Sequence, residues 1–179
     1  MKRCFDVALA GLLGLLGLVP MAIIALAVRA TSRGPVLYWS DRVGRGNHTF
    51  RMPKFRTMLV GAPIVATHLL HNPRAHLTRI GSFLRSTSLD ELPQLWSILR
   101  GDMTFVGPRP ALFNQYDLIE LRSQCGVDRL TPGLTGWAQI NGRDDLSISE
   151  KVQLDAEYLE RKCLWLDLSI LCCTVLKVA

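Results

Sequence analysis

The apolar residues of this sequence are gathered toward its two ends, and the longest apolar run covers residues 7–28. This run contains no charged side chain. It is long enough for a helix to cross the hydrocarbon core of a bilayer, which takes about 20 residues. Pro20 lies inside the run, where a proline removes one backbone hydrogen bond and kinks a helix. The pattern therefore predicts a kinked, membrane-inserted helix near the N-terminus.

The residues leave two topologies open for this helix. Basic residues normally mark the cytoplasmic side of a membrane helix, yet they flank this run on both sides, as Lys2, Arg3, Arg29 and Arg33. A helix that breaks at Pro20 and returns to the face from which it entered would satisfy both flanks. An ordinary transmembrane helix with a proline kink is the alternative.

Shorter patterns predict the elements of the central chain. Residues 36–39 have the composition of a strand. Residues 78–100 carry apolar positions at helical spacing and are expected to be largely helical, with Gly101 ending the helix. Residues 114–124 predict another short helix. Glycine and proline indicate loops at 107–110 and 131–136.

The C-terminal end is expected to be helical and to change polarity along its length. From residue 149 the pattern is polar, and residues 163–179 then carry only Asp167 and Lys177 as charged side chains. Such an apolar helix can lie in the membrane interface with Trp165 at headgroup level. A core helix of the domain is an equally weighted alternative.

Composition and charge narrow the range of partners. The 179 residues suffice for one domain with a core, and the net charge of +6 favours anionic partners such as phosphates or anionic lipid. The basic residues are dispersed and are not interleaved with stacking aromatics, so no nucleic-acid binding is expected. The five cysteines form no CxxC pair, so neither a disulfide framework nor a zinc site is expected.

Asp90 and Glu91 are adjacent carboxylates within an otherwise apolar segment, and they are the leading candidates for chemistry. A capping box, in which Ser88 and Glu91 cap the start of a helix, explains Glu91 but leaves Asp90 unexplained. The functional interpretation makes Asp90 a nucleophile, because a carboxylate can attack phosphorus and hold a covalent phosphoryl intermediate.

A carboxylate that approaches a diphosphate meets anionic repulsion, so this chemistry needs a divalent metal ion and basic side chains. Prolines on both sides of Arg109 restrict its backbone. A single arginine is usually only a solvated surface residue. The presence of Asp90 and Glu91 in the same sequence is what favours a phosphate-binding role for these cations. The candidate phosphate-binding residues are Lys54, Arg56, Arg79, Arg85 and Arg109.

Four motifs resemble those of the bacterial sugar transferases, the monotopic phosphoglycosyl transferases that start glycan assembly on a lipid carrier. The central motifs are TRIGSFLRSTSLDELPQL at 78–95 and GDMTFVGPRP at 101–110. KFRTM at 54–58 is similar to the upstream basic motif, and PGLTGWAQINGR at 132–143 is similar to the downstream motif. The resemblance covers essentially the whole chain, and the joint match is far more specific than any single motif.

The resemblance implies a reaction in two steps. Asp90 would attack the β-phosphate of a UDP-sugar and expel UMP, and the phospho-sugar would then pass to undecaprenyl phosphate. Mg²⁺ is the implied cofactor, with Asp90 as its protein contact, and Glu91 would orient or deprotonate the acceptor phosphate. Lys54, Arg85 and Arg109 match basic positions of the family and would bind phosphate groups. Further candidates for substrate binding lie in the downstream motif: Gln139, Asn141 and Arg143.

The resemblance also implies how the chain is organised. The expected fold class is α/β, mostly helical with few short strands, with a re-entrant N-terminal membrane helix and interfacial amphipathic helices. Residues 1–33 would form the anchor, broken at Pro20. Residues 34–179 would form one catalytic domain on the cytoplasmic face of the bacterial inner membrane, the minimal unit of the family. Val19 departs from small family members that carry serine before this proline, so other groups must hold the kink.

Two other classes of function stay open at this point. One is a non-catalytic peripheral protein that binds anionic lipid, and the other is a phosphohydrolase in which water resolves the phospho-Asp90 intermediate. Release of UMP from a UDP-sugar separates the enzyme from the lipid-binding protein, and a requirement for polyprenyl phosphate separates the transferase from the hydrolase. The sequence leaves open the sugar, the glycan pathway, the contacts to uracil and whether the chain forms an interfacial homodimer.

Overall fold

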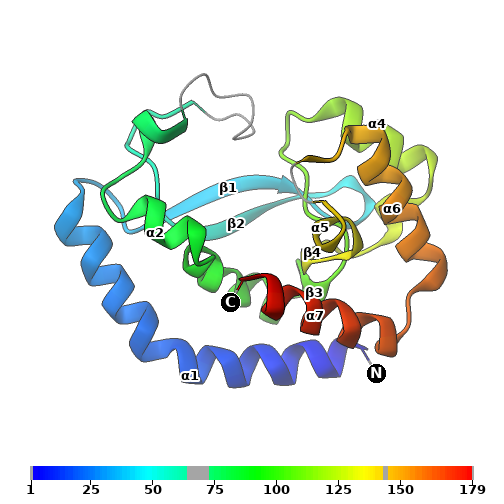
Figure 1. Ribbon diagram of the computed structural model, residues 1–179, viewed down its shortest axis with the longest axis horizontal. Helices are drawn as coiled ribbons and strands as arrows, with labels where there is room; N and C mark the ends of the chain where they lie inside the picture. The colour runs from blue at the N-terminus through cyan, green and yellow to red at the C-terminus, as the bar shows by residue number, and fades with distance from the viewer. Residues whose placement is uncertain (1, 64–72, 143–144, 179) are drawn as a thin grey trace.

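The computed structural model describes residues 2–63, 73–142 and 145–178. Over these residues the fold is mostly helical with few short strands, which confirms the predicted fold class (Figure 1). In chain order the elements are α1 (Lys2–Thr31), β1 (Leu37–Val43), η1 (Arg45–Asn47), β2 (Thr49–Phe55), η3 (Pro73–His76), α2 (Gly81–Ser86), η4 (Leu89–Gln94), α3 (Leu95–Arg100), β3 (Thr104–Val106), α4 (Tyr116–Gln124), η5 (Val127–Arg129), β4 (Gly133–Thr135), α5 (Trp137–Ile140), α6 (Ile148–Arg161) and α7 (Leu164–Val178).

Helix α1 is long and apolar, and it runs along one side of the molecule with a bend along its length (Figure 1). Within the described residues it is the one helix that could cross a membrane by length and composition. Pro20 lies inside α1, and the helix continues on both sides of it. The break predicted at Pro20 is therefore not observed, and α1 is one helix. A proline removes one hydrogen bond from a helix, and the helix can accommodate this loss by bending.

Both ends of α1 pack on the rest of the protein, whereas its middle stays open. Asp6 and Ala10 near its start are buried, as are Ile24 and Val28 near its end. Residues 11–20 between them are exposed or half-buried throughout. The helix thus contacts the same domain twice and presents an apolar surface between the two contacts.

Polar side chains at the start of α1 bond into the domain. Asp6 Oδ2 accepts a hydrogen bond from Thr104 Oγ1 at 2.6 Å. Lys2 Nζ lies 2.6 Å from Asp167 Oδ2 and donates to the carbonyl oxygen of Val106 at 2.8 Å. Because these bonds occupy charged groups of the first helical turns, the start of α1 is part of the domain.

The strands β1 and β2 form an antiparallel hairpin, and β1 extends the strand expected at 36–39. Tyr38 is the partner of Lys54 across the hairpin. Because alternate residues of a strand share a face, Tyr38, Arg42 and Lys54 lie on the same face of the hairpin. Arg42 and Lys54 are the two cations on this face, and β2 contacts the segment that contains Asp90 and Glu91.

The segment expected to form one helix over 78–100 is divided into α2, the 3₁₀ turn η4 and α3. Ser88, with a φ of 56°, lies in the left-handed region and interrupts the helix before η4. Its side chain makes no capping hydrogen bond, so the capping-box interpretation is wrong. Pro93 lies inside η4, where its missing N–H disfavours continuous α-helical bonding. The acidic pair therefore occupies a tight turn between two short helices.

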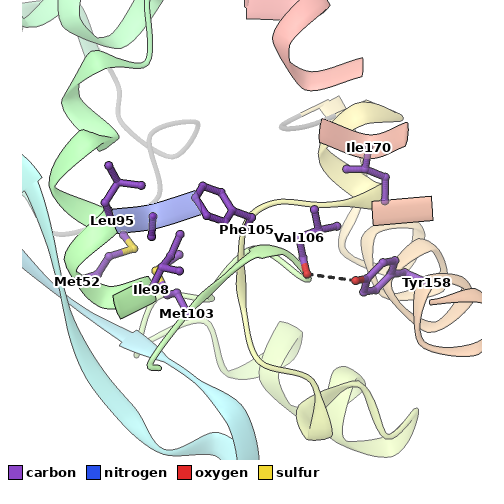
Figure 2. Close-up of a cluster of buried hydrophobic side chains, with 9 residues drawn as sticks. Met52, Leu95, Ile98, Met103, Phe105, Val106, Tyr158 and Ile170 are labelled. Carbon is purple, nitrogen blue, oxygen red and sulfur yellow. Dashed lines mark hydrogen bonds between the residues drawn. The ribbon is translucent and has the colours of Figure 1, made fainter. Parts of the chain in front are cut away.

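The main core lies where β2, α3, β3, α6 and α7 meet (Figure 2). Its buried side chains include Met52, Leu95, Ile98, Met103, Phe105, Val106, Tyr158 and Ile170, and Tyr158 Oη donates to Val106 O at 3.1 Å. Strands β3 and β4 pair in parallel, so the loop expected at 131–136 contains a short strand. The helix expected at 114–124 is confirmed as α4.

Helix α7 has one packed face and one open face. Asp167 and Ile170 are buried, which supports the core-helix alternative for this segment. Trp165 and Leu176 are each 78% exposed on the same helix. The open face keeps an apolar surface that an interfacial helix requires.

Candidate active site

Glu91, on the turn η4, is held by two cations. Lys54 Nζ from β2 lies 2.6 Å from Glu91 Oε1. Arg109 Nη2, from the loop after β3, lies 2.9 Å from the same oxygen. Burial alone would raise the pKa of Glu91, but the charges of Arg109 and Lys54 outweigh it and hold this pKa far below its ordinary value. Glu91 is therefore an anion at any working pH, and it fixes both cations beside Asp90.

Asp90 is buried next to this cluster but is not bonded to it. The residue is 6% exposed, and among the described residues no hydrogen bond or ion pair reaches its carboxylate. Burial raises the pKa of Asp90, and the charges of Lys54, Arg85 and Arg109 oppose that shift only in part. Buried carboxylates with perturbed pKa values gather at functional sites, so Asp90 is the leading candidate for the reactive group in this arrangement.

The loop that carries Arg109 is fixed by donors to its backbone. Arg122 Nη1 on α4 donates to the carbonyl oxygen of Arg109 at 2.8 Å. Arg42 Nη1 on β1 donates to Pro110 O at 3.0 Å, and Gly133 N on β4 donates to Pro108 O at 2.8 Å. Elements distant in sequence therefore set the direction of the Arg109 backbone.

Arg122 is itself held by a buried ion pair. Its Nη2 lies 2.6 Å from Asp155 Oδ2 on α6, and the two side chains are 11% and 1% exposed. Its Nε donates to the same carboxylate oxygen at 3.0 Å. The pair joins α4 to α6 and leaves Nη1 of Arg122 directed at the Arg109 carbonyl.

Arg42 is a site residue that the sequence reasoning missed. Burial and the nearby Arg109 lower the pKa of Arg42 to about 10, against the attraction of Glu91, so it remains a cation at neutral pH. Its Nε donates to Ser40 Oγ at 3.0 Å. The signal available in the sequence was the alternation of the two strands, which places Arg42 on the face that carries Lys54.

The other predicted cations fall in three different settings. Arg85 lies close enough to Asp90 to affect its pKa, and its Nε donates to Thr57 Oγ1 at 3.0 Å. Arg79 is exposed and makes no hydrogen bond or ion pair within the described part of the chain. Arg56 is buried and donates to Ser32 O at 2.9 Å and to Arg33 O at 2.6 Å. Arg56 also donates to Ser32 Oγ at 2.6 Å, so both terminal nitrogens of its guanidinium bind the chain after α1.

Gly34 shows why the Arg56 guanidinium fits here. A Cβ atom at this position would lie 2.1 Å from Arg56 Nη1, and the φ of Gly34 is +117°. Only glycine adopts this conformation and leaves space for the guanidinium. Gly34 therefore leaves the space that the Arg56 guanidinium occupies, which supports a structural role for Arg56.

The downstream motif lies on and around α5. Both side-chain atoms of the Gln139 amide are buried without a hydrogen-bond partner. Asn141 Nδ2 donates to Trp137 O at 2.8 Å and lies at the surface. Arg143 lies outside the described residues. No bond of the described residues joins this group to Asp90 and Glu91, so its substrate-binding role stays a prediction.

The Asp90 carboxylate is the one group of this cluster that could contact a magnesium ion. Within the described ranges no cluster of three or more His, Cys, Asp or Glu side chains is present. Mg²⁺ does not need such a cage, because one or two carboxylates commonly hold it together with substrate phosphates and water. The Asp90 carboxylate is open for this contact, whereas Glu91 Oε1 is committed to Lys54 and Arg109.

Comparisons with known proteins agree with the motifs. The sequence model of the family described as bacterial sugar transferase matches residues 1–179. The undecaprenyl-phosphate glucose phosphotransferase of Komagataeibacter xylinus is 40% identical over 97% of this chain and 35% of its own length. The UDP-glucose:undecaprenyl-phosphate glucose-1-phosphate transferase of Escherichia coli strain K12 is 42% identical over 99% of this chain and 40% of its own length.

A relative of similar size matches as well. The uncharacterized sugar transferase EpsL of Bacillus subtilis strain 168 is 39% identical over 99% of this chain and 87% of its own length. The chain thus spans less than half of the length of the Komagataeibacter xylinus and Escherichia coli relatives and most of the length of EpsL. Because the family match extends over every residue, the chain belongs to the bacterial sugar transferase family.

Proposed function

We propose that this protein transfers a sugar-1-phosphate from a UDP-sugar to undecaprenyl phosphate and releases UMP, as a first membrane step of bacterial glycoconjugate synthesis. The observation that carries the proposal is the unbonded, buried carboxylate of Asp90 beside the Lys54–Glu91–Arg109 cluster. The names of relatives that use UDP-glucose and undecaprenyl phosphate support these classes of donor and acceptor.

In the first step, an Oδ atom of Asp90 attacks the β-phosphorus of the donor. The bond between this phosphorus and the bridging oxygen breaks, and UMP leaves with that oxygen and its electron pair. The phospho-sugar then remains on Asp90 as an acyl phosphate. Lys54, Arg85 and Arg109 supply the positive charge that offsets repulsion between the carboxylate and the diphosphate.

In the second step, a phosphate oxygen of undecaprenyl phosphate attacks the same phosphorus. The bond from phosphorus to the Asp90 oxygen breaks, and Asp90 returns to its carboxylate form. The product is a sugar linked to the lipid through a diphosphate. The two displacements leave the protein's protonation unchanged, so the enzyme is ready for another donor.

Glu91 acts by positioning the cations. A carboxylate whose pKa lies far below its ordinary value is a weak base, so of the two roles expected for Glu91 the ion pairs favour orientation over deprotonation. Asp90 would hold Mg²⁺, which when bound would supply positive charge that offsets the charge of the diphosphate.

Attachment to one face of the membrane through a re-entrant α1 completes the proposal. Both ends of α1 contact the same domain, and the apolar middle between them is open, with Leu15, Leu16 and Val19 each more than half exposed. A helix held at both ends by one body returns to the side from which it entered. The cytoplasmic face of the inner membrane is the proposed side, because a water-soluble nucleotide-sugar reaches the site from the cytoplasm.

Release of UMP tests this function. The full chain in nanodiscs receives Mg²⁺, undecaprenyl phosphate and a panel that contains UDP-glucose and UDP-galactose. We expect UMP from one or a few donors, a lipid-linked sugar diphosphate as product, and dependence of turnover on the lipid. Steady UMP release without lipid would identify a hydrolase instead. Absence of UMP with a folded, membrane-bound protein would favour an anionic-lipid-binding protein.

The pH dependence of the first step reports on Asp90. Only the ionised carboxylate attacks phosphorus, and burial raises the pKa of Asp90. The rate of the UMP burst should therefore fall in acid with a midpoint above about 3.9, the ordinary value of an aspartate. Glu91 stays ionised over this range because its pKa is lowered, so it does not cause the fall. A single-turnover pH profile measures this midpoint, and a midpoint at or below the ordinary value contradicts the prediction.

Loss of Arg42 should weaken the site although no motif pointed to it. The variant Arg42→Met removes a cation near Glu91 and the donor to Pro110 O. Because a charged hydrogen bond contributes about 1.5–3 kcal/mol, we expect kcat/KM for the donor to fall about 10- to 100-fold. The matched variant Arg100→Met removes an arginine whose side chain is 60% exposed, and it should change this ratio less than about twofold. Equal effects of the two variants would rule out a local role for Arg42.

A further inference from the structure

A polar network joins the start of α1 to the strand that leads into the Arg109 loop. Lys2 Nζ donates to Asp167 Oδ2 on α7 at 2.6 Å, to Val106 O on β3 at 2.8 Å and to Tyr158 Oη on α6 at 3.0 Å. An ammonium group has three donors, so all those of Lys2 are used inside the protein. Three different elements of the domain therefore fix the position of this ammonium group.

A tyrosine and an aspartate complete the network from the domain side. Tyr158 Oη lies 2.6 Å from Asp167 Oδ1 and 3.1 Å from Val106 O. Burial and the Asp167 carboxylate raise the pKa of Tyr158, so its hydroxyl keeps its hydrogen. Because a hydroxyl has one hydrogen to share between these two acceptors, Lys2 is the main donor to the Val106 oxygen. Tyr158 and Asp167 are 3% and 5% exposed, so water competes little for these bonds.

The network holds one side of a single peptide unit, and β4 holds the other side. The Val106 carbonyl of this unit accepts from the network, and its Gly107 N–H donates to Thr135 O at 2.9 Å. A peptide unit is planar, so bonds to both of its polar groups set its orientation. Pro108 follows, with a φ that its ring restricts, and the next residue is Arg109. The orientation of this peptide unit therefore helps to set the backbone that carries Arg109.

We propose that Lys2 is a positioning residue for the transfer reaction and acts on Arg109 through the Val106–Gly107 peptide. The proposal rests on the proposed function, in which Arg109 offsets the repulsion between Asp90 and the donor diphosphate. Lys2 belongs to the first turn of the apolar helix α1. This helix then has a second role besides attachment, because displacement of its first turn would free the peptide that precedes the phosphate site.

The next residue of α1 offers a matched control. Arg3 is also a cation of the first turn and also binds backbone oxygens of the domain, with Nη1 donating to Ile98 O and Nη2 to Leu99 O at 2.8 Å. These oxygens lie near the end of α3 and not on β3. Lys2→Met and Arg3→Met therefore remove the same charge from the same flank of the apolar helix, and only Lys2→Met frees the Val106 carbonyl.

The first half-reaction tests the proposal with the full chain in nanodiscs. Exchange of labelled UMP into the UDP-sugar that releases UMP in the panel gives kcat/KM for the donor without acceptor. We expect Lys2→Met to lower this ratio about 10- to 100-fold, because small displacements of a group in the site cost that much. Tyr158→Phe removes one neutral hydrogen bond and should lower it about 2- to 10-fold. Arg3→Met should change it less than about twofold.

A double-mutant cycle separates positioning from a structural role. In an Arg109→Met background, Lys2→Met should lower the exchange ratio less than about twofold, because the residue that it positions is gone. A merely structural role would lower the ratio by the same factor in both backgrounds. Thermal unfolding and recovery in nanodiscs show that each variant is folded and membrane-bound.

The outcomes separate this inference from the function. Absence of exchange in wild type would overturn the proposed function and, with it, the role of Lys2. Exchange in wild type with equal ratios for Lys2→Met and Arg3→Met would overturn the positioning role alone, as would an equal loss in both backgrounds. Should Lys2→Met fail to fold, Tyr158→Phe decides. A loss that disappears in the Arg109→Met background supports positioning, and an unchanged ratio contradicts it.

Discussion

Replacing Asp90 by asparagine is expected to abolish UMP release, with turnover lowered by about four orders of magnitude or more, as when other covalent enzymes lose their nucleophile. The amide has nearly the same shape as the carboxylate, so the surrounding Lys54–Glu91–Arg109 cluster should stay in place. Its nitrogen and oxygen cannot form the acyl phosphate. Intact-mass measurement after mixing with donor should show the phospho-sugar adduct in wild type and none in the variant.

The same substitution should not destabilise the protein. The Asp90 carboxylate is buried and has no hydrogen-bond or ion-pair partner among the described residues, so its charge costs folding free energy. The apparent Tm of Asp90→Asn should therefore equal or exceed that of wild type while activity is lost. Asp102→Asn, at a partly exposed ion pair, serves as the matched control and should retain activity. Activity of Asp90→Asn within tenfold of wild type would place the nucleophile elsewhere.

Replacing Asp155 by alanine should give the largest loss of stability. It leaves the Arg122 guanidinium, 11% exposed, without its carboxylate partner. Removing one member of a buried ion pair destabilises proteins by about 3–5 kcal/mol. For a protein of this size that corresponds to a fall in Tm of about 10 °C or more, measurable by thermal unfolding in nanodiscs. Asp102→Asn should cost less than about 1 kcal/mol, because its pair is exposed.

A double variant separates stability from positioning at this pair. Arg122→Met with Asp155→Leu fills the space with apolar atoms, and such replacements of buried ion pairs are often neutral. We expect most of the lost Tm to return. Activity should stay low, because Arg109 O loses the donor that Arg122 Nη1 provides. Full recovery of activity along with stability would show that Arg122 does not position Arg109.

Local sequence patterns were enough to single out the adjacent carboxylates of Asp90 and Glu91 as candidates and to predict the apolar helix. The helix α4 and the hairpin strand β1 followed from spacing and composition, because both depend on neighbours along the chain. The break at Ser88 could not be predicted, since the apolar spacing of 78–100 continues through it. Ser88 adopts its left-handed conformation directly before η4, and η4 packs against β2, a strand that is distant in sequence.

The basic residues show where sequence reasoning fails. Arg56 and Lys54 are two positions apart in one motif, yet Arg56 binds carbonyl oxygens after α1 and Lys54 binds Glu91. Arg42 joins the candidate site because the hairpin puts it on the same face as Lys54 and near Glu91 and Arg109. Arg122 joins it because α4 returns to the Arg109 loop. Strand alternation could have placed Arg42 on the face that carries Lys54, whereas the contact of Arg122 with the Arg109 loop is long-range and does not follow from local spacing.

The carbonyl contacts along the loop that carries Arg109 have a consequence for binding entropy. The oxygens of Val106, Pro108, Arg109 and Pro110 each accept a hydrogen bond, from donors on α1, α6, β4, α4 and β1. The conformational freedom of this backbone is therefore lost during folding and not when substrate arrives. Preorganisation of this kind lowers the entropic cost of binding, so under the proposed function the donor diphosphate would meet a backbone that is already set.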